Sequence, residues 1–194
     1  MKIIRHRRNT IAELRDTPIN LGVEVDVRTF GDKLIIHHDP FVQGESFDEW
    51  IASYRHGLLI LNVKEEGLEE RLLDLMNKHS IKDFFFLDQS FPFIVKTTKR
   101  GEYRCAIRVS EFESIETALL MCGKVLWVWV DFFTRFPLDH EKFQKLQAAG
   151  LSICLVSPEL QGYDESCIFA LQKILKLEKI VPDAVCTKQP ELWI

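Results

Sequence analysis

The chain has 194 residues, of which 46% are apolar and 28% charged, and its formal net charge is −4 at pH 7. This composition is typical of a globular protein, and the length suits a single domain over residues 1–194. The acidic balance excludes a strongly basic nucleic-acid-binding protein, and no apolar run approaches the roughly 20 residues that span a bilayer. We therefore expect neither a nucleic-acid partner nor an integral membrane segment.

The N-terminus and the cysteines indicate a compartment. The first ten residues, MKIIRHRRNT, lack the apolar core of a signal peptide, so we expect a cytoplasmic protein. Five scattered cysteines without a Cys-x-x-Cys spacing favour reduced, structural thiols. Nothing in the sequence indicates an oligomeric state.

Strand-like and helical runs alternate over the whole chain. The strand candidates are residues 2–6, 22–27 with a hairpin arm at 33–38, 58–64, 83–89, 104–109, 125–132, 151–157 and 183–188. The helix candidates are residues 67–80, 111–123, 139–150 and 166–179. Asp139 is placed to cap the third of these helices, and Gly123 stands where the second should end.

This alternation predicts parallel βαβ units and an α/β fold. About eight strand runs suit a closed (β/α)8 TIM barrel, which would be compact, with short loops and some helices reduced to a turn. A doubly wound open sheet is the alternative.

The stretch GVEVDVR carries two carboxylates inside an apolar strand. Because side chains alternate along a strand, Val23, Val25 and Val27 share one face. Glu24 and Asp26 share the other face, which would point into the lumen of a barrel. Other polar residues fall at the ends of the first and third strands and after the hairpin: His6, His38, Asn62 and Lys64. We expect them to gather at the carboxyl end of the barrel, where barrel enzymes keep their active sites.

This constellation resembles the glycerophosphodiester phosphodiesterase family, whose barrel is shared with phosphatidylinositol-specific phospholipase C. The family opens with His-Arg-Gly and Glu-Asn-Thr, continues with Glu-x-Asp and His-Asp, and ends its third strand with Glu-x-Lys. The matching pieces here are His6-Arg7, Asn9-Thr10, Glu24-x-Asp26, His38-Asp39 and Asn62-Val63-Lys64. Weaker echoes follow at Ser90-Phe91, in GLSICLVSPE and in PDAVCTKQP, so the resemblance runs in order over nearly the whole chain.

The sequence also departs from the family pattern. The glycine of His-Arg-Gly is Arg8, and the third carboxylate of the family is Asn62. The loop before Asn9 is shortened, and the usual insertion after His-Asp is missing. Two later positions differ as well, with Val156 in place of a tryptophan and Lys188 in place of an aspartate. The parts that recognise the substrate are therefore remodelled, and most of the chemical core is kept.

The resemblance implies a divalent metal. Glu24, Asp26 and the amide oxygen of Asn62 offer hard oxygen ligands that suit Mg²⁺ or Ca²⁺, and Glu159 or Asp131 could complete the shell. The alternative for the two carboxylates is purely structural, namely salt bridges to Arg5, Arg28 or Lys64.

The family mechanism assigns roles to the remaining residues. His6 and His38 would be the acid/base pair for attack by a neighbouring substrate hydroxyl, which gives a cyclic phosphate before hydrolysis. Arg7 and Lys64 would bind the phosphate. Trp129 could line the wall for the substrate's alcohol, although packing is the plainer role for it, and Glu159 could contact substrate hydroxyls.

The function expected from the sequence is therefore metal-dependent hydrolysis of a small glycerophosphodiester-like molecule, a step of lipid metabolism. One alternative is a degenerate barrel that binds a phosphorylated ligand without turnover. Another is a lyase that stops at the cyclic product.

Overall fold

The computed structural model describes residues 1–194, which divide into two compact units. Unit 2 comprises Ile4–Glu102, and unit 1 comprises Met1–Ile3 and Tyr103–Ile194. Each unit is described by itself below.

Unit 2 is built on four parallel strands that follow one another in space as they do in the chain. β1 pairs with β2, β2 with β5, and β5 with β6. The hairpin arm β3 is antiparallel to β2, and β4 to β3. The elements are β1 (Lys2–Arg5, its last two residues in unit 2), α1 (Ile11–Asp16), β2 (Gly22–Phe30), β3 (Lys33–Ile36), β4 (Glu45–Ser46), α2 (Phe47–Ala52), β5 (Leu59–Val63), α3 (Glu69–Lys78), β6 (Phe84–Leu87) and α4 (Phe91–Lys99).

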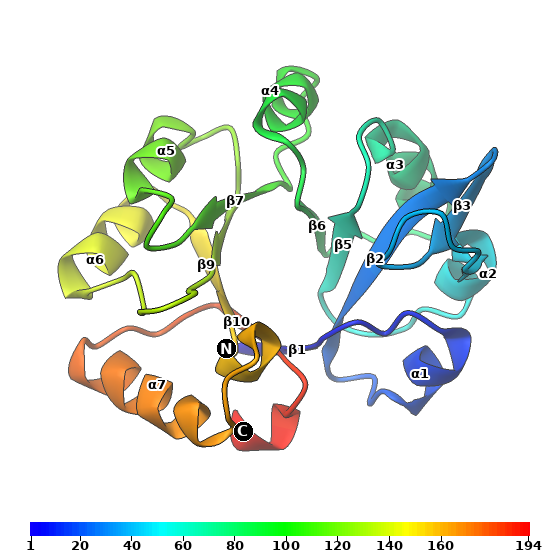
Figure 1. Ribbon diagram of the computed structural model, residues 1–194. Coiled ribbons are helices and arrows are strands. Elements are labelled where there is room, and N and C mark those ends of the chain that lie inside the picture. The colour runs from blue at the N-terminus through cyan, green and yellow to red at the C-terminus, as the bar shows by residue number, and fades with distance from the viewer. The chain divides into compact units, whose positions relative to one another are not determined.

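Unit 1 repeats the pattern of parallel strands and intervening helices. β7 pairs with β8, β8 with β9, and β9 with β10, all in parallel. In Figure 1 the three α-helices of this unit lie on the same side of its strands. The elements are β7 (Ala106–Val109), α5 (Ile115–Leu120), β8 (Trp127–Val130), α6 (His140–Ala148), β9 (Ser152–Val156), η1 (Pro158–Gln161), α7 (Ser166–Leu177), β10 (Ala184–Thr187) and η2 (Pro190–Leu192).

The predicted mixed α/β fold is confirmed. In each unit every new parallel strand adds next to the previous one, without the reversal of strand order that defines a doubly wound sheet. The predicted closed (β/α)8 barrel is not observed, because the sheet of unit 2 ends at β6, which pairs only with β5, and that of unit 1 ends at β7, which pairs only with β8.

The helices agree with the sequence in part. The predicted helix at 139–150 is observed as α6, and the Asp139 side chain accepts a hydrogen bond from the Lys142 backbone N–H at 2.8 Å, as a helix cap does. Helix α4 was not predicted, because it contains several β-branched residues, which are more typical of strands. It is helical because Ile94, Thr97 and Thr98 bury one face at helical spacing. None of the helices combines the length and the hydropathy that crossing a membrane requires.

Candidate functional site

The strand register of unit 2 brings the predicted polar residues to one level. Arg5, the last residue of β1, pairs with Val23, so His6, which follows it, comes level with Glu24. On the other edge of β2, Asp26 pairs with Asn62 of β5. Residues from three neighbouring strands, β1, β2 and β5, therefore meet near the carboxyl ends of β1 and β5 (Figure 1).

Glu24 is a buried carboxylate, with 1% of its surface exposed. It accepts hydrogen bonds from the Arg7 backbone N–H at 2.7 Å and from Asn62 Nδ2 at 2.8 Å. His6 Nε2 lies 3.8 Å from Glu24 Oε2, the oxygen that accepts the bond from Arg7. Burial, together with the nearby charge of Asp26, raises the pKa of Glu24 to about 7. The carboxyl group is thus poised between its two protonation states at neutral pH.

Asp26 is completely buried and lies next to two cations. Its Oδ1 is 3.3 Å from the Lys64 ammonium, and its Oδ2 is 3.4 Å from Arg7 Nε. Asn9 binds both the side chain and the main chain of Asp26. Asn9 Nδ2 donates to Asp26 Oδ2 at 2.8 Å, and the Asp26 backbone N–H donates to Asn9 Oδ1 at 3.0 Å. The salt bridge to Lys64 that the sequence offered as the structural alternative is therefore present.

Two buried oxygens of this cluster accept no hydrogen bond, namely Asp26 Oδ1 and Asn62 Oδ1. They belong to residues that pair directly across β2 and β5, and Asn62 is only 7% exposed. Buried oxygens without a donor are rare, and a carboxylate and an amide oxygen are ligands that Mg²⁺ and Ca²⁺ accept. No three His, Cys, Asp or Glu side chains gather around a possible metal position. The free oxygen donors are of the type that a hard cation accepts, and metal binding by Glu24, Asp26 and Asn62 stays a prediction.

The predicted phosphate-binding residues border this cluster. Arg7 adopts a left-handed backbone conformation, with φ of 47°, which is unusual for a residue other than glycine. Lys64 bridges Asp26 and Asp88, whose Oδ2 lies 3.1 Å from its ammonium group. A cavity of about 310 Å³ opens beside Lys64 and Asp88 at the ends of β5 and β6. Its size is that of a small-ligand pocket.

His38 stands on the loop that follows β3. Its Nδ1 lies 2.8 Å from Asp39 Oδ1, and 42% of its side chain is exposed. The neighbouring His37 contacts the main chain of Asp39 instead. Arg28 on β2 donates to the carbonyl oxygens of both histidines. The ring of His38 is thus oriented through Nδ1, and proton transfer by this residue stays a prediction.

Trp129 and Glu159 belong to unit 1. Trp129 is buried on β8. The Glu159 carboxylate accepts hydrogen bonds from Thr187 Oγ1 at 2.6 Å and from the Lys188 backbone N–H at 2.8 Å, and also from Ser157. This carboxylate fastens the end of β9 to the end of β10, so its contacts are structural. Substrate contact by Trp129 or Glu159 stays a prediction.

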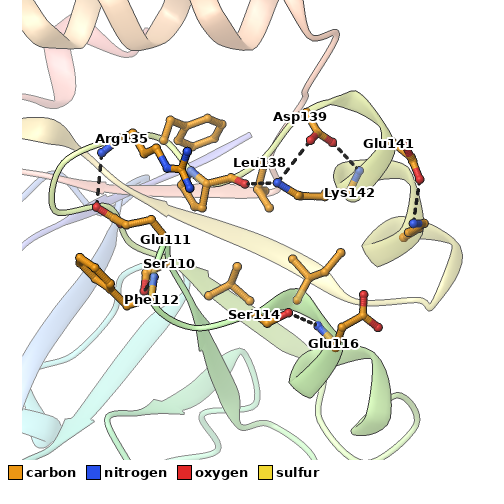
Figure 2. A pocket seen from close by; sticks show the side chains of 15 residues that line it. Ser110, Glu111, Phe112, Ser114, Glu116, Arg135, Leu138, Asp139, Glu141 and Lys142 are labelled. Atoms are coloured by element: carbon orange, nitrogen blue, oxygen red, sulfur yellow. Dashed lines mark hydrogen bonds and ion pairs between the residues drawn. The ribbon is translucent and has the colours of Figure 1, made fainter.

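A cavity of about 550 Å³ in unit 1 lies between the loops after β7 and β8. Figure 2 shows Lys142 beside Asp139, and Glu111 at the main chain of Arg135. Lys142 Nζ is 3.3 Å from Asp139, and Glu111 accepts the Arg135 backbone N–H at 3.3 Å. Because Lys142, Asp139 and Glu111 already have partners within the protein, we assign the cavity no function.

Two residues of the network were not predicted as site residues. Asn9 was noticed only as part of the Asn9-Thr10 match, and its bonds to Asp26 depend on how the chain turns at Arg7. Asp88 follows β6 directly, and that position was the signal that could have identified it.

No family model matches the sequence, and no curated protein matches it. Solved structures do. A Galdieria sulphuraria protein assigned as a glycerophosphodiester phosphodiesterase superposes with a TM-score of 0.74 at 16% identity, covering 99% of this chain and 96% of that one. The glycerophosphodiester phosphodiesterase of Agrobacterium tumefaciens gives 0.68 at 14%, covering 99% and 98%. A Parabacteroides distasonis enzyme of the same description gives 0.68 at 14%, covering 98% and 84%. The resemblance found in the sequence is confirmed at the level of the fold.

Proposed function

We propose that the chain is a phosphodiesterase that hydrolyses a small glycerophosphodiester-like molecule with the help of a divalent metal. One observation carries the proposal. The two predicted carboxylates, Asn62 and Lys64 form one network that Arg7 joins, and Lys64 opens into a cavity of about 310 Å³. The solved structures that share this fold include glycerophosphodiester phosphodiesterases.

Glu24, Asp26 and Asn62 would hold the metal. A bound Mg²⁺ or Ca²⁺ supplies positive charge for the phosphoryl oxygens as negative charge develops on them. Asn62 Oδ1 supports this placement, because it is buried and accepts no hydrogen bond; Asp26 Oδ1 accepts none either, and the Lys64 ammonium lies 3.3 Å from it. The neutral fraction of Glu24 near pH 7 must lose its proton before the residue can act as a ligand.

Arg7 and Lys64 would bind the phosphate, and His6 and His38 would move the protons. One imidazole takes the proton of the substrate hydroxyl next to the phosphate, as that oxygen forms its bond to phosphorus. The other imidazole gives a proton to the departing alkoxide as the second bond breaks. Water then opens the cyclic phosphate with the two roles exchanged.

The alternative of ligand binding without turnover also has an observation behind it. Arg7 and Lys64 both lie within ion-pair distance of Asp26, which neutralises its charge without a metal. A cluster that is balanced in this way can hold a phosphate without performing chemistry on it.

Turnover of glyceryl p-nitrophenyl phosphate tests the proposal. This ester keeps the neighbouring hydroxyl, and methyl p-nitrophenyl phosphate is the matched control that lacks it. We expect p-nitrophenolate release from the first ester only, in millimolar Mg²⁺ or Ca²⁺, and its loss in EDTA. If neither ester turns over in either metal while inorganic phosphate still binds, the enzyme proposal fails and the binding alternative stands.

A further inference from the structure

Arg28 is a nearly buried guanidinium that pairs with no carboxylate. It lies on β2 two residues after Asp26, and only 8% of its surface is exposed. Its Nε donates to the His37 carbonyl oxygen at 3.1 Å and its Nη2 to the His38 carbonyl oxygen at 3.0 Å. A buried arginine normally has an anionic partner, because desolvating its charge is costly. Here two main-chain carbonyls take that place.

The two bonds define the position of the peptide groups that they reach. A guanidinium presents its N–H groups in a rigid planar fork, so two simultaneous bonds fix both the distance and the orientation of the acceptors. Bonds from a charged donor are also stronger than neutral ones. Arg28 therefore holds the main chain of two consecutive residues at strand β2.

The loop that carries His38 has little else to hold it. Residues 37–44 join β3 to β4 without helix or strand, and Phe41 at the far side is almost fully exposed with φ of 63°. At its base Gly44 packs so closely that a Cβ would come within 2.1 Å of the Ile36 carbonyl oxygen. The His38 ring itself contacts Asp39, which is part of the same loop. Beyond the pairing of Ile36 with Val27, Arg28 adds a side-chain link from β2 to the main chain of His38 itself.

We propose that Arg28 is a positioning residue, which holds His38 against the strand that carries Glu24 and Asp26. The proposal rests on the proposed function, since it gives His38 its proton-transfer role. Arg28 acts through the main chain of the loop, and its effect on the rate comes from the placement of the imidazole.

The chain offers a matched control in Arg71. Its Nη2 also donates to a main-chain carbonyl of the same hairpin, that of Asp32 at 2.8 Å, but Arg71 is exposed and its bond reaches the far turn. The variants to compare are Arg28→Met, Arg28→Lys, Arg71→Met, His38→Ala and the double variant Arg28→Met/His38→Ala. Circular dichroism and thermal melting first establish that each is folded. If Arg28→Met does not fold, Arg28→Lys replaces it throughout, because it keeps the charge and most of the stem.

Two measurements decide the proposal. In turnover of an alkyl ester of glycerol phosphate, whose leaving group needs a proton, we expect Arg28→Met to lose about 10²-fold in kcat with KM little changed, Arg28→Lys to lose less, and Arg71→Met to match the parent. The double variant should be no slower than His38→Ala, because both changes remove the same contribution. Backbone amides of residues 38–44 should exchange with solvent faster in Arg28→Met than in Arg71→Met.

A double variant that loses the product of the two single losses overturns the proposal, because Arg28 would then act independently of His38. Equal amide exchange in Arg28→Met and Arg71→Met overturns it too. A parent without turnover overturns the proposed function instead, and the exchange comparison then decides by itself whether Arg28 anchors the loop.

Discussion

The two units treat their buried carboxylates differently. In unit 1, Asp131 at the end of β8 is buried, and burial raises its pKa. Its Oδ2 receives the Arg108 guanidinium, and its Oδ1 receives Gln161 and the Phe132 backbone N–H. Glu159 is similarly occupied by Thr187 and Lys188. Every contact here is supplied by the fold itself, which is the ordinary state of buried polar groups.

In unit 2 the buried polar groups are not all supplied with hydrogen-bond partners by the fold. Asp26 and Asn62 each keep a buried oxygen that accepts no hydrogen bond, and Glu24 next to them has a pKa near 7. Such groups cost free energy in the folded chain, so a fold retains them where something outside the fold completes them. The comparison therefore places the candidate chemistry in unit 2 and gives the carboxylates of unit 1 a structural role.

The largest expected effect is on the two histidines. General acid and base groups each contribute factors of about 10² to 10⁴, so His6→Ala and His38→Ala should each lower kcat for an alkyl ester of glycerol phosphate by about that much. Ligand affinity should change little, because the lost contribution arises when the proton moves. The double variant should lose much less than the product, since the pair acts as a unit. Steady-state kinetics on the four proteins measures this.

Esters with different leaving groups can show which histidine is the general acid and which is the general base. p-Nitrophenolate departs without a proton, so the variant that lacks the general acid should retain most of its activity on the aryl ester. It should lose activity on an alkyl ester of glycerol phosphate, whose leaving group needs the proton. Equal losses on both esters for both variants would contradict an acid/base division between His6 and His38.

The second prediction concerns the pH dependence of stability. Between its ordinary pKa of 4.5 and its folded pKa of about 7, Glu24 binds a proton in the folded chain and not in the unfolded one. The free energy of unfolding should therefore fall as pH rises through this window, by about 3 kcal/mol from this group alone. Glu24→Gln should remove that slope. Urea denaturation of both proteins across the window gives the difference.

A divalent cation sharpens this prediction. Mg²⁺ or Ca²⁺ at Glu24 and Asp26 favours the ionised carboxylate, so millimolar metal should flatten the slope of the parent and stabilise it most at pH 7. Glu24→Gln should respond less. A parent whose slope and stability ignore both metals would remove the metal from the proposed function.

The third prediction tests unit 1. Arg108→Met removes the cation that reaches Asp131, and we expect the free energy of unfolding to fall by about 1–3 kcal/mol, the cost of a buried polar group left without its partner. Metal-dependent stabilisation should be unchanged. If this variant instead abolished the response to metal, the structural role of the unit 1 carboxylates would be wrong.

Much of this arrangement could be predicted from the sequence. Because parallel strands end at one edge, the placement of polar residues near the ends of residues 2–6 and 58–64 was enough to predict that His6, Glu24 and Asn62 would meet. The network around Glu24 and Asp26 confirms that grouping. Their chemical roles stay predictions.

Other features depend on contacts that no strand pattern contains. Asn9 reaches Asp26 because the chain turns at Arg7 in a left-handed conformation. Glycine adopts this conformation more readily than arginine does, so the residue type gave no sign of the turn. Arg28 was read as a salt-bridge candidate, yet it binds two carbonyl oxygens. That choice depends on how the loop folds back. Helix α4 was missed because its β-branched residues suggest a strand.

The smallest expected effect concerns Asn62, the position where the family pattern has a carboxylate. Asn62→Glu adds a negative charge beside the two buried carboxylates, so we expect it to bind Mg²⁺ or Ca²⁺ about tenfold more tightly, because ligand charge tunes the affinity of oxygen sites. Asn62→Gln is the matched control, since it has the same length as Glu without the charge.

Without metal, the added negative charge should also raise the pKa of Glu24 further, because it repels the ionised carboxylate as Asp26 already does. The fall in stability with rising pH should therefore be steeper in Asn62→Glu. Calorimetric metal titration of the three proteins measures the first effect and urea denaturation the second. Equal metal affinity in Asn62→Glu and Asn62→Gln would mean that the cation does not sense position 62. The unpartnered oxygen of Asn62 would then be a cost of this fold without a ligand to explain it, and the contrast between the two units would lose its functional meaning.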